Sequence, residues 1–396
     1  MLNTIQRTPA VERANKIDPR ILLLALGMFA LGTDAFVVAG VLPVIARETG
    51  VTEGLAGQLV TVFSLTYGLG APLLAAVTGH WSRNRILVIA LGAFCLSNVG
   101  SALAPTFGVL LLMRILTGCF AALYAPLAYT TGTTLATPEK RGQALSLVLG
   151  GLVIATVLGS PLGTWVGEHF GWRLSFGLVA LLAGIAWAAL MLCGLPKPVD
   201  AATLSLRARL APIKEPRLLL ALSPTLLGNL GLYMVYTYLA LLLQQNMHVM
   251  AISGLLIVFG LGTATGNWIS GVVADRIGAV RPIIGALIGL AIILSTLQFA
   301  TNSLVGGIPA LFLWGLLVPF LNLSQQHRLL SLAPEHANVI LALNSSMLYL
   351  GIAGGAALGG VALRYVAVTQ LGWLGTVCAL LALLMLVLSM RVEGKP

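Results

Sequence analysis

Charged residues are scarce in this sequence. Asp, Glu, Lys and Arg together make up only 9% of the 396 residues, whereas 58% are hydrophobic. A soluble domain has roughly 25% charged residues, so this chain lacks the charge needed to cover a surface that faces water. Apolar runs of about 20 residues, enough to cross ~30 Å of hydrocarbon, recur along its whole length. The composition therefore excludes a soluble enzyme and indicates an all-α membrane protein.

Cysteine and the common enzyme signatures are equally sparse. The four cysteines each fall inside an apolar run without CxxC spacing, so we interpret them as small buried hydrophobic residues. HExxH, GxSxG and the Walker lysine loop do not occur, which argues against metal-dependent, hydrolytic and ATP-driven chemistry. We therefore expect no enzyme activity, no cofactor and no metal. A cleavable signal peptide is not apparent either, and we expect the first span to be retained.

The basic residues are unevenly distributed. The formal net charge is +10, but Lys and Arg occur in short segments between apolar runs and are not interleaved with aromatic residues, so no nucleic-acid partner is expected. Eighteen of the 22 basic residues fall on the side of the predicted membrane that carries both termini, and three fall on the other side. Lys and Arg accumulate on the cytoplasmic side of membrane proteins. The pattern predicts that both termini are cytoplasmic.

The apolar runs predict twelve transmembrane helices in two bundles of six. We expect the helices near residues 20–46, 54–79, 85–104, 106–134, 139–167, 172–195, 217–245, 251–274, 281–301, 305–332, 335–363 and 368–390. The predicted domain organisation is a cytoplasmic N-terminal segment 1–19, a six-helix bundle 20–195, a cytoplasmic linker 196–216, a six-helix bundle 217–390 and a cytoplasmic tail 391–396.

An internal repeat relates the two predicted bundles. Residues 67–70 read YGLG and residues 259–262 read FGLG, with an offset of 192 residues. Further along, the Pro-Glu pair at 138–139 recurs at 334–335, with an offset of 196 residues. The two offsets fit a duplication with one short insertion. Transporters built from two repeats bind their substrate near the midplane, between the repeats.

Two ionisable residues lie deep in the predicted spans, Asp34 in the first and Arg114 in the fourth. A charge at the bilayer centre costs at least ~2.5–3.5 kcal/mol, and such residues usually face a cavity and mark the path of an ion or a substrate. Our hypothesis is that Asp34 is the proton or cation site and that Arg114 tunes it. The alternative is that the two side chains simply pair and neutralise each other.

Two helix ends carry related motifs of glycine and charged residues. The connection between predicted spans eight and nine comprises Gly271, Asp275, Arg276 and Gly278. An acidic residue there can bind backbone groups or a neighbouring Arg and so hold helices together, although an ordinary capped loop is the alternative. The equivalent segment of the first half contains Gly79 and Arg83 but no carboxylate.

The predicted fifth span contains Gly159, Pro161 and Gly163. Proline kinks a helix and removes a backbone donor, and glycine lets a neighbouring helix approach closely. The segment suits a gating or sealing role and, equally, plain helix packing.

Polar and aromatic residues at helical spacing predict part of the wall of a substrate cavity. The predicted lining residues are Asp34, Asn229, Tyr233, Tyr236, Trp314, Asn344 and Tyr349. Packing within a bundle is the alternative role for each of these side chains.

The chain resembles the major facilitator superfamily over essentially its full length. Residues 271–281 resemble the cytoplasmic loop motif of the superfamily, and Arg114-x-x-x-Gly118 resembles the span-four motif whose Arg is linked to proton transfer. Residues 159–163 are similar to the span-five motif of antiporters, with Ser160 interposed, and residues 32–43 to the span-one signature of the drug–proton antiporter and sugar-efflux branch. The first-half loop motif departs from the pattern because it lacks Asp.

The resemblance implies the major facilitator fold, a bacterial inner-membrane location and alternating access. It also implies secondary active efflux of small lipophilic, often cationic drugs in exchange for protons, with the lipid bilayer as surroundings and a monomer as the expected state. Proton-coupled export of sugars or other polar metabolites is the first alternative. An uptake symporter is the next, because a fold alone does not fix direction. The alternative from a different class is a non-transporting membrane sensor or scaffold. Such a protein would need no intramembrane Asp, so Asp34 argues against it.

Overall fold

The computed structural model describes residues 17–78, 81–195, 215–247, 252–332 and 334–393. Gly79 and most of the predicted linker 196–216 lie outside the described residues, as do residues 1–16 of the predicted N-terminal segment and 394–396 of the predicted tail. The described part of the chain is helical and contains no strand.

The twelve predicted transmembrane helices are confirmed. The first half forms α2 (Pro19–Thr49), α3 (Glu53–Ala56), α4 (Gln58–Val77), α5 (Arg83–Ala102), α6 (Phe107–Leu135), η1 (Pro138–Lys140), α7 (Arg141–Ile154), η2 (Ala155–Gly159), α8 (Ser160–Phe170) and α9 (Trp172–Cys193). The second half forms α11 (Pro216–Tyr236), α12 (Leu239–Met247), α13 (Ile252–Ile277), α14 (Val280–Ala300), α15 (Leu304–Leu332), η4 (Pro334–His336), α16 (Ala337–Ala362), η5 (Val368–Gln370) and α17 (Leu371–Glu393).

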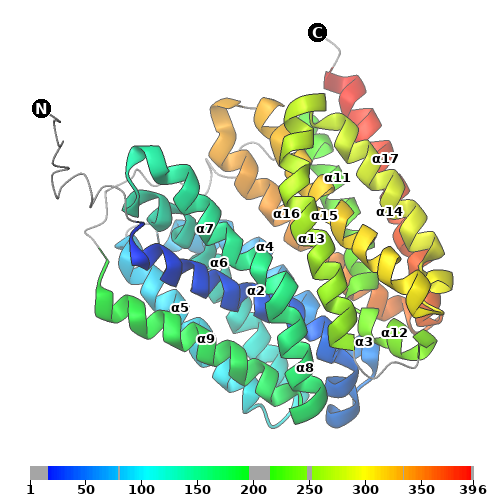
Figure 1. The fold of residues 1–396 in the computed structure, drawn as a ribbon, viewed down its shortest axis with the longest axis horizontal. Coiled ribbons are helices and arrows are strands. Elements are labelled where there is room, and N and C mark those ends of the chain that lie inside the picture. Colours follow the sequence, from blue (N-terminus) through cyan, green and yellow to red (C-terminus); the bar gives the residue numbers. More distant parts are fainter. Residues whose placement is uncertain (1–16, 79–80, 196–214, 248–251, 333, 394–396) are drawn as a thin grey trace, which may run out of the picture.

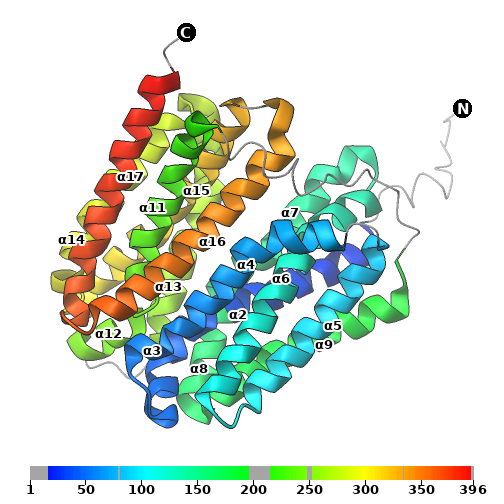
Figure 2. The same cartoon turned by 180° about the vertical axis from the view of Figure 1, so that it is seen from behind.

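The helices of each half form a bundle of their own, and the two bundles lie side by side (Figures 1 and 2). The chain crosses between the two ends of the molecule an even number of times, twelve. The start of α2 and the end of α17 therefore lie at the same end, which we call the terminus-bearing end. The opposite end is called the distal end. The bundles meet where α4 packs on α16 and where η2 and α8 pack on α13. Their ribbons converge near α3, α8 and α12 and diverge toward the terminus-bearing end (Figures 1 and 2).

Local chemistry sets the helix ends. The side chain of Asp18 accepts a hydrogen bond from the backbone N–H of Arg20 and caps the start of α2, as short polar side chains commonly do at helix N-termini. At its other end α2 stops at Gly50, whose φ of 69° is the left-handed conformation that glycine adopts without steric cost. The predicted helices 85–104 and 106–134 leave only residue 105 between them, and the structure has a similarly short connection, since α5 ends at Ala102 and α6 begins at Phe107.

The predicted seventh transmembrane helix is broken in the structure. Residues 217–245 were expected as a single helix, but α11 ends at Tyr236 and α12 begins at Leu239. At the break the backbone N–H of Tyr238 binds the carbonyl of Val235, a bond that spans three residues instead of four, and this tighter turn redirects the chain. Because the sequence there contains neither proline nor glycine, the break has no local signal.

Residues from both halves share one apolar core near the distal end. Leu42 and Ala46 of α2 are buried in the same cluster as Leu239 and Leu243 of α12. The first transmembrane helix thus lies against both bundles and carries Asp34 close to the surface where the bundles meet.

Candidate functional site

Asp34 and Arg114 meet inside the first bundle. Both side chains are fully buried, and the guanidinium Nη1 of Arg114 donates to Oδ1 of Asp34 at 2.6 Å. Nη2 of Arg114 donates to the backbone carbonyl of Asp34 at 3.4 Å. The structure therefore brings together the two residues that sequence analysis placed deep in the spans, on α2 and α6.

Aromatic rings enclose this ion pair. The guanidinium carbon of Arg114 lies 4.4 Å from the ring centre of Phe63 and 5.8 Å from that of Phe176, within the distance at which a cation is attracted to an aromatic face. Among the described residues, Oδ2 of Asp34 and Nε of Arg114 have no hydrogen-bond partner. A buried carboxylate with one unpartnered oxygen retains a position for a proton or for a ligand that donates a hydrogen bond.

The predicted segment Gly159–Gly163 packs directly against the helix that carries Asp34. A Cβ placed on Gly159 would overlap Oγ1 of Thr33, and one placed on Gly163 would lie 2.6 Å from Cγ2 of Val37. Gly159 ends η2, a single π-helical turn, and Pro161 follows at the start of α8, which continues the same helix. Because proline has no N–H, a carbonyl of the preceding turn lacks its usual helical donor. The structure thus places Gly159 and Gly163 against α2, close to Asp34 in the chain.

The π-helical turn also contacts the second bundle. Gly260 of α13 lies against it, since a Cβ there would be 2.5 Å from the carbonyl oxygen of Thr156 and 2.7 Å from Cα of Val157. A π-helical turn inside an α-helix is often found at functional sites. Here it lies between the Asp34 helix and the opposite bundle, so a movement of α13 relative to the first bundle has a direct path to α2.

The predicted cavity residues of the second half separate into two groups, one polar and one aromatic. In the polar group, Nδ2 of Asn229 donates to Oδ1 of Asn322 at 2.9 Å, and the hydroxyl of Thr225 donates to Oδ1 of Asn344 at 2.6 Å. Asn229 and Asn344 are both buried. These amides therefore crosslink α11, α15 and α16 within their own bundle.

The aromatic group lies where the two bundles meet. Tyr236 packs on Trp314 at 6.2 Å between ring centres, on Tyr233 at 5.6 Å and on Phe36 of α2 at 6.2 Å. Trp314 is fully buried behind Tyr236. Phe36 and Asp34 lie on the same helix but on different faces of it, so the aromatic group of the second half contacts the helix that carries Asp34.

Tyr349 forms a second aromatic contact between the bundles. Its ring stacks on that of Tyr67 of α4, with 3.7 Å between the ring centres. Tyr67 in turn lies 6.3 Å from Phe63, the ring beneath Arg114. A continuous series of side chains therefore connects the ion pair to α16.

Direct contacts join the bundles at the distal end, and two of them involve Glu168 and Gly54. The carboxylate of Glu168 on α8 accepts hydrogen bonds from the backbone N–H of Ile252 at 2.9 Å and from the hydroxyl of Ser253 at 3.2 Å, at the start of α13. Elsewhere at this end, the backbones of Gly54 of α3 and Gly360 of α16 are in contact. A Cβ on Gly54 would lie 2.5 Å from the carbonyl oxygen of Gly360, and a Cβ on Gly360 would lie 2.6 Å from that of Gly54.

The second-half loop motif lies at the terminus-bearing end of α13 and α14. Oδ1 of Asp275 is 3.4 Å from Nε2 of His327 on α15, and both side chains are exposed, so the observed partner of Asp275 is a histidine on a neighbouring helix and not an arginine. Gly278 has a φ of 80° and turns the chain after α13, which explains the glycine there. Gly271 and Arg276 lie within α13, and Arg83 begins α5.

Several residues of the site were not recognised from the sequence. Arg328 is 3% exposed, and its Nη2 donates to Ser389 at 2.7 Å; the sequence analysis had counted it among the charges at helix ends. Glu168 and Phe63 gave no signal in the sequence, and Tyr67 was singled out only as the first residue of the repeated YGLG. Arg328 and Glu168 both lie near helix ends, where side chains are usually exposed, so their positions in the sequence did not indicate the contacts that they form.

Twelve membrane-spanning helices in two related halves, with a buried ion pair beside the surface where the halves meet, are typical of membrane transporters built from repeats. The sequence profile described as Major Facilitator Superfamily matches residues 24–356, and the chain belongs to this family. It is therefore a multi-pass inner-membrane transporter with a small-molecule substrate, and not an enzyme.

Named relatives support this assignment. The chain is 32% identical to the inner membrane transport protein YdhP of Escherichia coli strain K12 over 389 residues, 96% of this chain and 98% of that protein. It is 35% identical to a chloramphenicol resistance protein of Streptomyces lividans over 64% of this chain and 66% of that protein. A probable sugar efflux transporter of Mannheimia succiniciproducens is 28% identical over 93% of both chains.

A solved structure supports the fold. A point mutant of the nucleoside transporter NupG superposes with a TM-score of 0.73 and 12% identity, covering 94% of this chain and 100% of that one. The predicted major facilitator fold is confirmed.

Proposed function

We propose that the protein exports small lipophilic, often cationic compounds in exchange for protons by alternating access, as a monomer. The observation that carries the proposal is the buried Asp34–Arg114 ion pair, with the unpartnered Oδ2 of Asp34, next to the surface where the bundles meet. The similarity to a chloramphenicol resistance protein supports drug export.

The coupling follows from the chemistry of the pair. A proton on Asp34 removes the negative charge that neutralises Arg114, so the two protonation states favour different packing of α2 against α6. A cationic substrate near Asp34 competes with the proton, because both are attracted to the same carboxylate. Each proton that enters through a potential of ~100 mV releases about 2.3 kcal/mol, and this free energy drives export.

The proposed orientation places the terminus-bearing end in the cytoplasm, as the distribution of basic residues predicts. In that orientation the Glu168 and Gly54–Gly360 contacts close the periplasmic side, and the observed conformation is the one that receives substrate from the cytoplasm. Residues 20–195 and 217–390 act as the two moving bodies, and the segments 1–19, 196–216 and 391–396 lie in the cytoplasm.

The two halves have different roles in the proposed mechanism. The first half carries the ion pair and handles the proton, with Gly159, Pro161 and Gly163 transmitting movement to α2. In the second half, Tyr233, Tyr236 and Tyr349 contact the substrate, because they lie where the bundles meet, while Asn229, Trp314 and Asn344 hold the wall in place. In the proposed cycle Asp275 and Arg276 steady the cytoplasmic ends of the helices.

The test is substrate-stimulated proton release from proteoliposomes that contain the full-length protein. We expect a lipophilic cation and chloramphenicol to release protons with wild type, and Asp34→Asn to abolish the release. The matched control is Asp18→Asn, the same substitution at the cap of the same helix, which retains wild-type release. Wild-type coupling in Asp34→Asn would refute the proton-site role, and absence of transport for every compound would favour a sensor or scaffold.

Export of a sugar is the second candidate function. The sugar efflux relative and the buried amides around Asn229 favour it, since sugars are recognised through several hydrogen bonds. Adding a monosaccharide and a disaccharide to the compound panel separates the two candidates: sugar-stimulated release that Asn229→Leu abolishes, without a response to the lipophilic cation, would select sugar export.

A further inference from the structure

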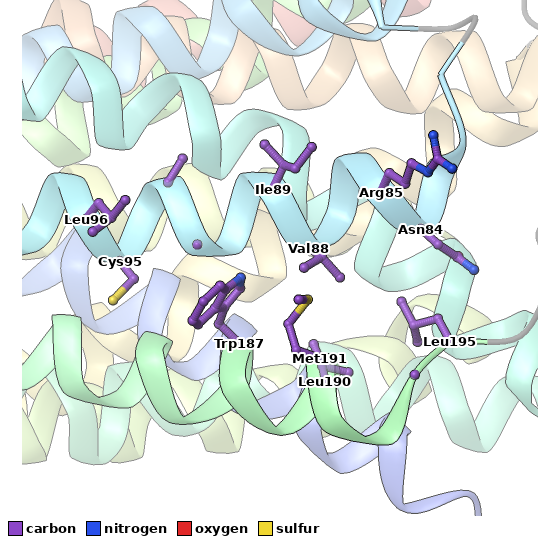
Figure 3. Close-up of a pocket in the computed structure, with 13 residues that line it drawn as sticks. Asn84, Arg85, Val88, Ile89, Cys95, Leu96, Trp187, Leu190, Met191 and Leu195 are labelled. Carbon is purple, nitrogen blue, oxygen red and sulfur yellow. The ribbon is translucent and has the colours of Figure 1, made fainter.

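A groove of about 680 Å³ lies on the outer surface of the first bundle, between α5 and α9 (Figure 3). Figures 1 and 2 show that these helices lie on the side of the bundle away from the second bundle, so the groove is separate from the candidate transport site. Ile89 and Met191 at its edges are 54% and 57% exposed. In a membrane protein such a surface faces the lipid.

The groove has one polar end and is otherwise apolar. Asn84 and Arg85 lie at its terminus-bearing end, and Cys95 and Leu96 lie at the other end, near the middle of the span (Figure 3). Because Gly92 has no side chain, the indole of Trp187 fits against the backbone of α5 and forms the central wall. The thiol of Cys95 donates to the carbonyl of Ala180 at 3.2 Å and ties the two helices together at the inner end.

The length of the groove matches one membrane leaflet. From Asn84 to Leu96, a rise of ~1.5 Å per residue gives about 18 Å. Half of a ~30 Å hydrocarbon core is about 15 Å. An acyl chain that starts at the level of Arg85 therefore runs the length of the groove and ends near the bilayer midplane.

The charge at the polar end selects the headgroup. Arg83 and Arg85 both lie in the first turn of α5, which contains no acidic residue. Within the described part of the chain, neither forms an ion pair with a carboxylate. Basic pockets between transmembrane helices on the cytoplasmic side bind anionic lipid headgroups. A zwitterionic headgroup also carries a phosphate, but its ammonium group repels Arg83 and Arg85, so a headgroup with net negative charge binds more tightly.

We propose that the α5–α9 groove is a binding site for one anionic phospholipid of the leaflet at the terminus-bearing end. Arg85 contacts the phosphate group, and one acyl chain lies along Ile89, Trp187 and Met191. The proposal is independent of the transport function, since it depends on the groove, the charge at its end, its length and the orientation that the basic residues predict.

The test is native mass spectrometry of the full-length protein in detergent, titrated with phosphatidylglycerol or with phosphatidylcholine of the same acyl chains. Wild type binds one phosphatidylglycerol more tightly than phosphatidylcholine. Arg85→Gln weakens this binding about fivefold, the factor that corresponds to about 1 kcal/mol for a basic residue at the membrane surface. Arg141→Gln removes a charge at the same end of the bundle but away from the groove, and changes the affinity less than about twofold, since it lies outside the contact with the headgroup.

Two further measurements test the groove itself. Ala93→Phe fills it and abolishes the single tight adduct. At one brominated phosphatidylglycerol per protein, tryptophan fluorescence is quenched in wild type and is quenched less in Trp187→Phe, which keeps the proposal testable if Ala93→Phe fails to fold. The exposed Trp165, Trp268 and Trp373 are quenched only at higher lipid ratios. Inorganic phosphate and glycerol phosphate at the same concentration do not displace the lipid.

Three results would overturn the proposal. Equal affinity for the two lipids would show non-selective boundary lipid. An equal effect of Arg85→Gln and Arg141→Gln would show that the charge acts through the membrane surface and not through the groove. Displacement by phosphate alone, or by a drug-sized apolar compound, would assign the groove to a different ligand.

Discussion

The Asp34–Arg114 ion pair has a short contact distance, but burying its two charges costs free energy. Removing two charges from water costs several kcal/mol per ion, and only good geometry and further hydrogen bonds offset that cost. Here the 2.6 Å contact and the flanking rings of Phe63 and Phe176 provide part of the compensation, while Oδ2 of Asp34 and Nε of Arg114 have no partner within the described residues. A purely structural role explains the contact but not the unpartnered oxygen.

The energetic coupling of the pair can be measured. Arg114→Gln leaves the Asp34 carboxylate buried without its partner, so we expect the free energy of unfolding in detergent to fall by about 3–5 kcal/mol. The double variant Asp34→Asn/Arg114→Gln replaces both charges and is expected to recover most of that loss without recovering transport. If the double variant transports protons and substrate like wild type, the pair has only a structural role.

Single residues could be recognised from the sequence where their residue type is rare in the membrane spans. Asp34 and Arg114 stood out because ionisable residues are almost absent from the spans, and the structure brings them together. Tyr67 and Phe63 did not stand out, because an aromatic residue in an apolar helix has no chemical contrast with its neighbours. Their positions depend on how α4 meets α6 and α16, and single-helix periodicity does not contain that information.

The fifth span illustrates how one element can combine packing and conformational change. Its π-helical turn is contacted by Gly32 and Thr33 of α2 on one side and by Gly260 of α13 on the other. The sequence identified the segment through Gly159 and Pro161, but not the π-helical turn, because a π-helical turn depends on the surrounding helices as much as on composition.

The role of close packing at Gly159 can be tested with a substitution that impairs transport and a second substitution that restores it. We expect Gly159→Ala to impair transport strongly, since the new methyl group overlaps Oγ1 of Thr33, next to Asp34. Gly150→Ala lies in the same span, where a Cβ meets nothing within 4 Å, and is expected to transport like wild type in the same proteoliposome assay. Thr33→Ala removes the overlapping oxygen, so the double variant Gly159→Ala/Thr33→Ala should recover part of the activity. No recovery would mean that Gly159 acts through its backbone and not through packing.

For the molecule as a whole, the number of spans and the two-fold repeat could be predicted because both depend on local hydropathy and internal similarity. The relative placement of the bundles could not, since a transporter has at least two arrangements of similar free energy. Glu168 and Gly54 show the consequence: each belongs to one bundle in sequence, and each has its notable contact in the other.

The contact between Gly54 and Gly360 offers a test of that arrangement. The three atoms nearest to a Cβ on Gly54 all belong to Gly360, in the opposite bundle, so we expect Gly54→Leu to leave each bundle folded but to prevent closure of the distal end. Thermal stability in detergent should change little, whereas spin labels on the distal ends of α3 and α16 should move apart and transport should be lost. Gly254→Leu, on α13 near the same end but with open space around it, is the matched control and should keep the wild-type distance. An unchanged distance together with full transport in Gly54→Leu would show that this contact does not limit closure.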